Sequence, residues 1–293
     1  MTWAIDAGST EVPLIEQTIG DNLEEIVARF GDREALVVDH QGIRQTWNEF
    51  NASVNAVAKG LMAYGIGQGD RVGMWSPNYA EWVYVQFATA KIGAIQVNIN
   101  PAYRTSELEY AMNQSGCKML VTRSEYLTSA YQDMVEQVRP NCPDLTCVVY
   151  FDTNDWADLL AAGESVSGQD LSARMASLSQ NDDINIQYTS GTTGFPKGAT
   201  LSHRAILNDA KFVGMMCDYD ETDRVAIPVP FYHCFGMVMG NLCCAVFGAT
   251  MVIPCPTFDP AAVLRVVEAE RCTSLYGVPT MFIAELGHTD LGT

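Results

Sequence analysis

The sequence predicts an α/β protein whose layers are built from mostly parallel sheets. Short apolar runs typical of strands alternate along the chain with longer, helix-like segments. Glycine, proline and asparagine stand at nearly every boundary between a strand-like and a helix-like segment. Such alternation favours parallel strands joined by helical crossovers. A chain of 293 residues is also long enough to bury a sizeable core in one or two domains.

The first predicted elements are a hairpin and the helix that follows it. Runs 34–38 and 43–46 are apolar or alternating, and a glycine-containing turn separates them. Thr46 with Glu49 three residues later fits a capping box, in which each side chain bonds the other residue's backbone N–H. We therefore expect a helix that begins at Thr46 and runs to about Tyr64.

The next elements continue the alternation of strands and helices. Asn78 is expected to cap a helix that reaches Lys91, and Ser106 with Glu109 to cap another. Residues 161–182 are polar and rich in glycine and serine, so we expect a connection there. The remaining predictions are strands at 71–75, 94–97, 118–121 and 146–150, and a helix near 125–138.

A second series of elements is predicted after residue 182. The start of this second series divides the chain into a first α/β part, residues 1–182, and a second α/β part, residues 183–293. The second series consists of a strand at 183–188, a loop, a helix at 203–216, a strand near 225, a helix near 240, a strand at 249–253, a helix at 260–270 and a strand at 273–276.

Charge and composition exclude several classes of function. The formal net charge is −18, which argues against binding to nucleic acid or to an anionic membrane surface. Residues 225–258 carry no charged side chain, but four prolines interrupt them, so we expect no transmembrane segment. The nine cysteines show no Cys-x-x-Cys pair and the chain no secretory signal, so we expect reduced thiols and a cytoplasmic location.

The most informative segment is the run from Tyr188 to Ala199, which lies between a predicted strand and a helix-like stretch from Ser202. Glycines allow backbone N–H groups to turn toward an anion, hydroxyls add donors, and Lys197 adds a positive charge. A Walker A loop needs four residues between its glycines, whereas Gly191 and Gly194 have only two residues between them. The run therefore predicts a phosphate-binding loop of another kind. An ordinary surface turn is the weaker alternative.

The run resembles the nucleotide-binding loop of the adenylate-forming, or AMP-binding, superfamily of acyl- and aryl-CoA synthetases, luciferases and adenylation domains. The likeness covers almost the whole chain, and the sequences of its motifs most resemble those of the medium-chain fatty acyl-CoA synthetases. The other segments that carry it are 69–75, 98–104, 228–236 and 276–282.

The resemblance implies a fatty acid–CoA ligase. Such an enzyme activates a carboxylate with Mg-ATP to an acyl-adenylate and then forms a thioester with CoA. His233 and Lys197 are the implied catalytic residues, although a lone histidine in an apolar run is more often a core residue. Arg104 is a further candidate cation for ATP or CoA. The implied phosphate-binding residues are Thr189, Ser190, Gly191, Thr192, Thr193, Gly194, Phe195, Pro196 and Lys197. An acyl pocket is implied at Phe231, Tyr232, Cys234 and Met237, with core packing as the alternative.

Family members continue for about as long again beyond the point that matches Thr293. The adenine-stacking motif, the Mg²⁺ ligand, the ribose-binding aspartate and the C-terminal lid domain are thus expected outside this chain. We accordingly interpret the chain as an incomplete N-terminal domain, inactive as a ligase alone. The alternatives are an aryl- or amino-acid-activating relative and a non-catalytic binding protein derived from this fold. A homo-oligomer is left open.

Overall fold

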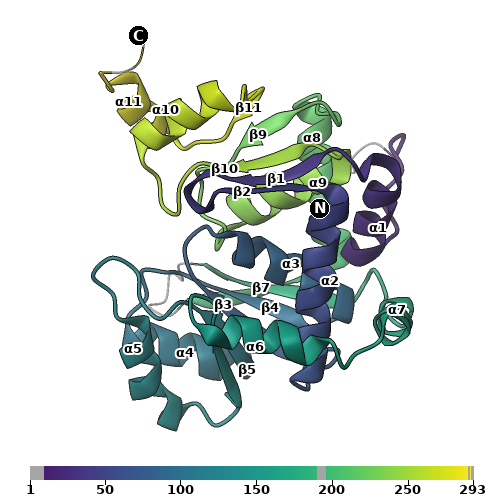
Figure 1. Ribbon diagram of the computed structural model, residues 1–293, viewed down its shortest axis with the longest axis vertical. Coiled ribbons are helices and arrows are strands. Elements are labelled where there is room, and N and C mark those ends of the chain that lie inside the picture. The colour runs from purple at the N-terminus through teal and green to yellow at the C-terminus, as the bar shows by residue number, and fades with distance from the viewer. Residues whose placement is uncertain (1–9, 190–195, 290, 292–293) are drawn as a thin grey trace, which may run out of the picture.

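The computed structural model describes residues 10–189, 196–289 and 291, which form two sheets with helices between and around them (Figure 1). The strands are β1 Glu34–Val38, β2 Ile43–Thr46, β3 Arg71–Trp75, β4 Ile95–Ile99, β5 Cys117–Thr122, β6 Cys147–Tyr150, β7 Asp183–Thr189, β8 Lys197–Ser202, β9 Arg224–Ala226, β10 Thr250–Ile253 and β11 Ser274–Leu275. The helices are α1 Ile19–Phe30, α2 Trp47–Ala63, α3 Ala80–Ile92, α4 Thr105–Ser115, α5 Tyr131–Val138, α6 Asn154–Gly163, α7 Gly168–Ala176, α8 His203–Met216, α9 Cys243–Phe247, α10 Pro260–Ala269 and α11 Pro279–Leu286. A π-helix, Phe235–Leu242, runs directly into α9.

The expected α/β class with mostly parallel strands is confirmed. One sheet has the order β11-β9-β10-β1-β2, and the other has the order β6-β5-β3-β4-β7-β8. Every pairing is parallel except the β1–β2 hairpin and the β7–β8 hairpin. Each sheet takes strands from both sides of residue 182, because β1 pairs with β10 and β4 pairs with β7. The division of the chain at that residue stays a prediction.

Helix α3 is the central element of the core. All of its residues except Glu81 are buried, including the polar Gln86 and Lys91, so the helix is enclosed on nearly every side. It packs on α1 and α2 and against the six-stranded sheet. On the other face of that sheet, α4 and α5 cover a second core, in which the rings of Trp75 and Tyr131 stack with centroids 4.1 Å apart.

Two predictions about helix starts are wrong, and one is confirmed. Thr46 and Glu49 form the expected capping box of α2. Asn78 does not cap α3; Gln41, from the turn after β1, accepts a hydrogen bond from the Ala80 N–H at 2.8 Å instead. Ser106 and Glu109 do not form the cap of α4 either, since that helix begins at Thr105.

The prediction of a simple connection at residues 161–182 is also wrong. The segment holds the end of α6 and the whole of α7. Ser167 opens α7 with a capping box to Asp170, and Leu171 is buried under it. The helix expected over 125–138 is shorter, because α5 begins only at Tyr131.

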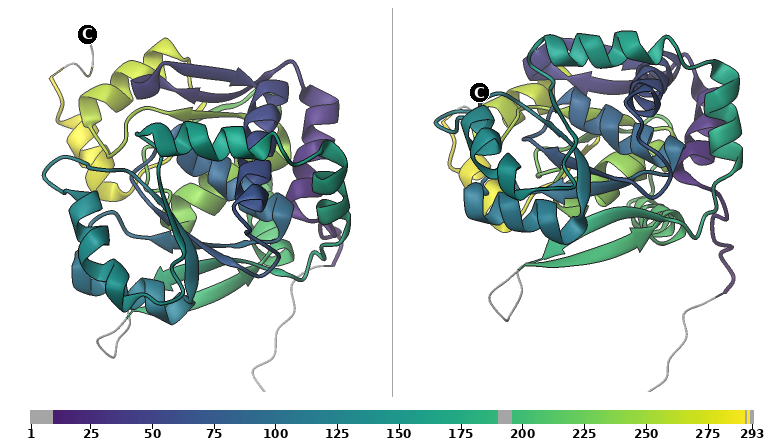
Figure 2. Two further views of the ribbon diagram at one scale, coloured as in Figure 1. Left: turned by 60° about the horizontal axis from the view of Figure 1, so that its bottom comes forward. Right: turned by 90° about the horizontal axis from the view of Figure 1, so that it is seen from below.

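The segment after the glycine-rich run differs most from expectation. Lys197–Ser202 is predicted as part of the loop but forms β8, antiparallel to β7, with Thr189 paired to Lys197, and the predicted helix at 203–216 follows as α8. The predicted phosphate-binding loop thus joins two strands of a hairpin, not a strand and a helix. Figure 2 shows this hairpin at the edge of the six-stranded sheet.

Candidate functional site

The β7–β8 hairpin places a hydroxyl and a cation on one rung of the sheet. Thr189 and Lys197 are directly paired, and side chains of directly paired antiparallel residues lie on the same face. Both residues are exposed. Gln187, two residues before Thr189, shares that face because strand side chains alternate. The root of the hairpin therefore carries groups that suit an anion.

The opposite face of the hairpin ties it to α4. Tyr188 donates its hydroxyl to the Ala111 carbonyl at 3.1 Å, and Tyr110 donates to the Pro196 carbonyl at 3.1 Å. Burial raises the pKa of the Tyr188 phenol, so this group stays neutral and serves as a donor. The two tyrosines fix where the hairpin lies on the rest of the protein.

His233 lies in the irregular segment between β9 and the π-helix. Its imidazole is exposed, and Nδ1 accepts a hydrogen bond from the Phe235 N–H at 3.1 Å. In a neutral imidazole one ring nitrogen accepts and the other carries the proton. This hydrogen bond therefore assigns the proton of neutral His233 to Nε2, where it is available to an oxygen of a ligand.

The hairpin and the His233 segment meet around one cavity of about 570 Å³, here called the hairpin cavity. Of the residues predicted from the sequence, it brings together Thr189, Pro196, Tyr232, His233 and Cys234. The cavity is completed by Asn98, Asn100, Tyr103, Gln187 and Tyr188. Sequence reasoning missed the three amides in this set, although polar residues near the ends of apolar strands were a usable signal.

The other predicted site residues lie elsewhere. Phe231 is fully buried against Trp82, with ring centroids 5.4 Å apart, and Met237 is buried in the main core. Lys197 is not in the cavity wall but stands beside it through its pairing with Thr189. The predicted residues Ser190, Gly191, Thr192, Thr193, Gly194 and Phe195 lie outside the described residues.

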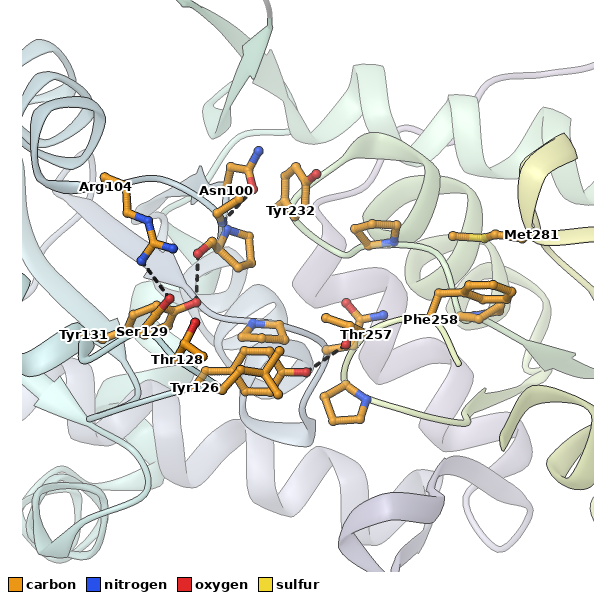
Figure 3. Close-up of a pocket in the computed structure, with 18 residues that line it drawn as sticks. Asn100, Arg104, Tyr126, Thr128, Ser129, Tyr131, Tyr232, Thr257, Phe258 and Met281 are labelled. Atoms are coloured by element: carbon orange, nitrogen blue, oxygen red, sulfur yellow. Dashed lines mark hydrogen bonds between the residues drawn. The ribbon is translucent and has the colours of Figure 1, made fainter. Parts of the chain in front are cut away.

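A second cavity of about 390 Å³ adjoins the first and is called here the inter-sheet cavity (Figure 3). Asn100 and Tyr232 line both cavities. The wall otherwise comes from segments that follow strands of both sheets, the place where open α/β folds bind ligands. They contribute Pro77, Asn78, Pro101, Ala102, Arg104, Tyr126, Leu127, Thr128, Ser129, Tyr131, Pro228, Pro230, Pro256, Thr257, Phe258 and Met281.

The inter-sheet cavity is largely apolar, with a few polar groups in its wall. Arg104 is exposed and donates to the Ser129 hydroxyl at 2.9 Å. The hydroxyls of Tyr126 and Thr257 lie 2.8 Å apart and join the two sides of the cavity. In Figure 3, Arg104 and Met281 lie at opposite ends of the view. The cavity thus offers a cation at one end and apolar surface at the other.

The described residues, 10–189, 196–289 and 291, contain no group of three or more His, Cys, Asp or Glu side chains placed to hold a metal ion. Within these ranges, no helix has both the length and the apolar character to cross a membrane.

Comparison with known sequences finds a match over nearly the whole chain. A family model described as AMP-binding enzyme matches residues 23–292. The mitochondrial medium-chain acyl-CoA ligase ACSF2 of Danio rerio is 43% identical, over 97% of this chain and 50% of that protein. The putative acyl-CoA synthetase YngI of Bacillus subtilis is also 43% identical, over 94% of this chain and 54% of that protein. The chain spans about half the length of these curated relatives.

Solved structures show the same fold. The inhibitor-bound N-terminal domain of FACL13 from Mycobacterium tuberculosis superimposes with a TM-score of 0.82 at 24% identity. That match covers 94% of this chain and 67% of the other. ATP-bound MatB from Rhodopseudomonas palustris superimposes with a TM-score of 0.75 at 24% identity, over 94% of this chain and 52% of that one.

Proposed function

Because this chain belongs to the family of AMP-binding enzymes, we propose that the protein containing it is an ATP-dependent fatty acid–CoA ligase. The observation that carries the proposal is the hairpin cavity, which joins the Thr189–Lys197 rung to the exposed imidazole of His233. The reaction has two steps. A carboxylate oxygen bonds to the α-phosphorus of ATP as pyrophosphate leaves, and the CoA thiol then displaces AMP from the acyl carbon.

The hairpin is proposed to hold the triphosphate. The Lys197 ammonium would offset charge on the leaving pyrophosphate, and the Thr189 hydroxyl would donate to a phosphate oxygen. Mg²⁺ is expected to arrive with ATP. In the first step these groups position the leaving pyrophosphate and offset its charge. Because the attacking carboxylate carries no proton, that step needs no side chain to act as a base.

His233 is proposed to serve the reacting centre. Its Nε2–H points away from the Nδ1 that the Phe235 N–H occupies, so it is a donor for a carboxylate or α-phosphate oxygen. Two anions must approach each other in this step, and a fixed donor between them reduces their repulsion. Cys234, beside it, keeps a neutral thiol because burial raises its pKa.

The inter-sheet cavity is proposed to receive CoA. The pantetheine arm of CoA is long and uncharged, whereas its nucleotide end is anionic. An apolar channel with Arg104 at one end matches that asymmetry. Tyr232 and Asn100 line both cavities, so a thiol in one would lie next to an acyl-adenylate in the other.

Acid-dependent ATP–pyrophosphate exchange tests this function in the protein that contains this chain. We expect exchange with octanoate and a fall of about 100-fold in Lys197→Ala, the scale of losing one charge-stabilising group. Lys59→Ala, a half-buried lysine on α2, is the matched control and should keep the activity. Preference for benzoate or an amino acid would favour the aryl- or amino-acid-activating alternative. Absence of exchange with every acid would favour the non-catalytic one.

The same exchange assay, applied to the 293-residue chain alone, tests whether that chain is inactive. A homo-oligomer and a cytoplasmic location stay predictions, and the ACSF2 relative is described as mitochondrial.

A further inference from the structure

A chain of buried amide side chains runs from the middle of the six-stranded sheet to the His233 segment. On β4, Gln96 donates to the Asn98 Oδ1 at 2.9 Å, and Asn185 on β7 donates to the same oxygen at 2.9 Å. Asn98 in turn donates to Gln187 Oε1 at 3.1 Å. All four amides are buried, so each bond is made where water is scarce and an unmade bond is costly.

Gln187 is the last residue in this series of amides, and both its amide nitrogen and its amide oxygen form hydrogen bonds. Its Nε2 donates to the Tyr232 carbonyl at 2.5 Å, and its Oε1 accepts from Asn98 and from the Cys234 thiol at 3.5 Å. A backbone carbonyl can only accept, so the orientation of this amide is fixed by its partner. Gln187 therefore holds the residues on both sides of His233.

The segment that Gln187 holds has little regular structure of its own. His233 lies between an irregular stretch and the π-helix, whose rare geometry often marks functional sites. A second pair of amides fixes the π-helix, since Gln86 donates to the Met237 carbonyl at 3.1 Å and accepts from Asn241 at 3.0 Å. The amides thus add side-chain hydrogen bonds to the turn and π-helix bonds of this part of the chain.

We propose that Gln187 is a positioning residue that sets the distance between the imidazole of His233 and the phosphate-binding rung of the hairpin. Thr189 follows Gln187 on the same face of β7, so one strand carries both the anion donor and the support of His233. This role rests on the proposed function. Without Gln187, the Tyr232 carbonyl would lose its donor and the segment would settle elsewhere.

The test compares Gln187→Leu with Gln96→Leu. Each variant replaces one buried glutamine, Gln187 on β7 or Gln96 on the neighbouring strand β4. The general loss of stability should therefore be similar in both. Gln96 has no bond to the His233 segment, and Asn98 keeps Asn185 as a donor when Gln96 is changed. In pyrophosphate exchange, we expect Gln187→Leu to lose about 10- to 100-fold in kcat with little change in KM for ATP, and Gln96→Leu to keep kcat.

A second readout does not depend on activity. The chain has four histidines, so imidazole signals of ¹³C-labelled histidine are few, and His233→Gln identifies the signal of His233. We expect that signal to move and broaden in Gln187→Leu and to stay in place in Gln96→Leu. An unchanged His233 signal in Gln187→Leu, or an equal change in both variants, would overturn the proposal. If no acid supports exchange in the unmodified protein, the proposed function fails, while the histidine signals still decide the role of Gln187.

Discussion

Acidification from pH 7 to pH 4 is expected to destabilise this protein through His203, the first residue of α8. The ring is fully buried, and Nδ1 accepts a hydrogen bond from the Ile19 N–H at 3.2 Å. Nε2 has no partner among the described residues. Burial lowers the pKa of His203 to about 4, although the carboxylates of Asp182 and Asp21 oppose this effect.

The size of the effect follows from the two pKa values. In the unfolded chain a histidine titrates near 6.5. Between pH 6.5 and 4 the unfolded state binds a proton that the folded state does not, so the free energy of unfolding falls as the pH falls. The stability is fully present above pH 6.5. At about 1.4 kcal/mol per pH unit, the loss by pH 4 is about 3 kcal/mol.

Urea unfolding followed by tryptophan fluorescence at pH 7 and pH 4.5 measures this loss. In His203→Asn, the amide oxygen can accept from the Ile19 N–H but nothing titrates, so the difference between the two pH values should shrink by about 2–3 kcal/mol. Burial also lowers the pKa of His40 to about 4. The stability lost through His40 on acidification is the same in the variant and in the unmodified protein. An equal loss of stability in the variant and the unmodified protein would refute the reasoning.

Three further outcomes are expected. Gly248→Ala should cost about 1–3 kcal/mol, because Gly248 has φ 72° and a Cβ would lie 2.5 Å from the Phe30 ring. Lys91→Met should cost about 1–3 kcal/mol, because the buried Asn51 Oδ1 loses its donor at 2.6 Å. Both are measured by urea unfolding. Cys217→Ser should abolish the fast phase of labelling by a thiol reagent, because Cys217 is exposed, whereas the other eight cysteines are buried or half-buried.

Matched variants separate these causes from general damage. Gly65→Ala has a similar φ of 80° but open space around the added methyl, so it should cost less than Gly248→Ala. Lys59→Met changes a lysine that is only half-buried and should be nearly neutral. Equal costs within either pair, or a fast thiol phase that persists without Cys217, would contradict the corresponding structural reason.

The sequence was sufficient where a structure depends on neighbours along the chain. Thr46 and Glu49 are three residues apart, and their capping box formed as expected. Asn78 carries a similar signal, yet its amide donates to the Val229 carbonyl at 2.9 Å and accepts from the Phe231 N–H at 2.9 Å. No local pattern reveals a partner about 150 residues away, so tertiary contacts overrode the capping preference.

The candidate site shows the same limit. Resemblance indicated Thr189 and His233, and the structure places both at one cavity. Resemblance did not mark Gln187 or Asn98 as site residues, because their role depends on contacts that join β4, β7 and the His233 segment. Strand β8 was missed because its polar, glycine-containing sequence has a low strand propensity. Its hydrogen-bonded pairing with β7 stabilises it as a strand in spite of that propensity.

The place of β1 between β2 and β10 has a consequence for biosynthesis. The hairpin of β1 and β2 is made early, but its parallel neighbour β10 begins only at Thr250. A ribosome adds about 5–20 residues per second, so the intervening stretch of about 200 residues takes about 10–40 s. During that interval the open edge of β1 has no partner from its own chain. We expect the nascent protein to rely on chaperones over this period, since unpaired apolar edges promote aggregation.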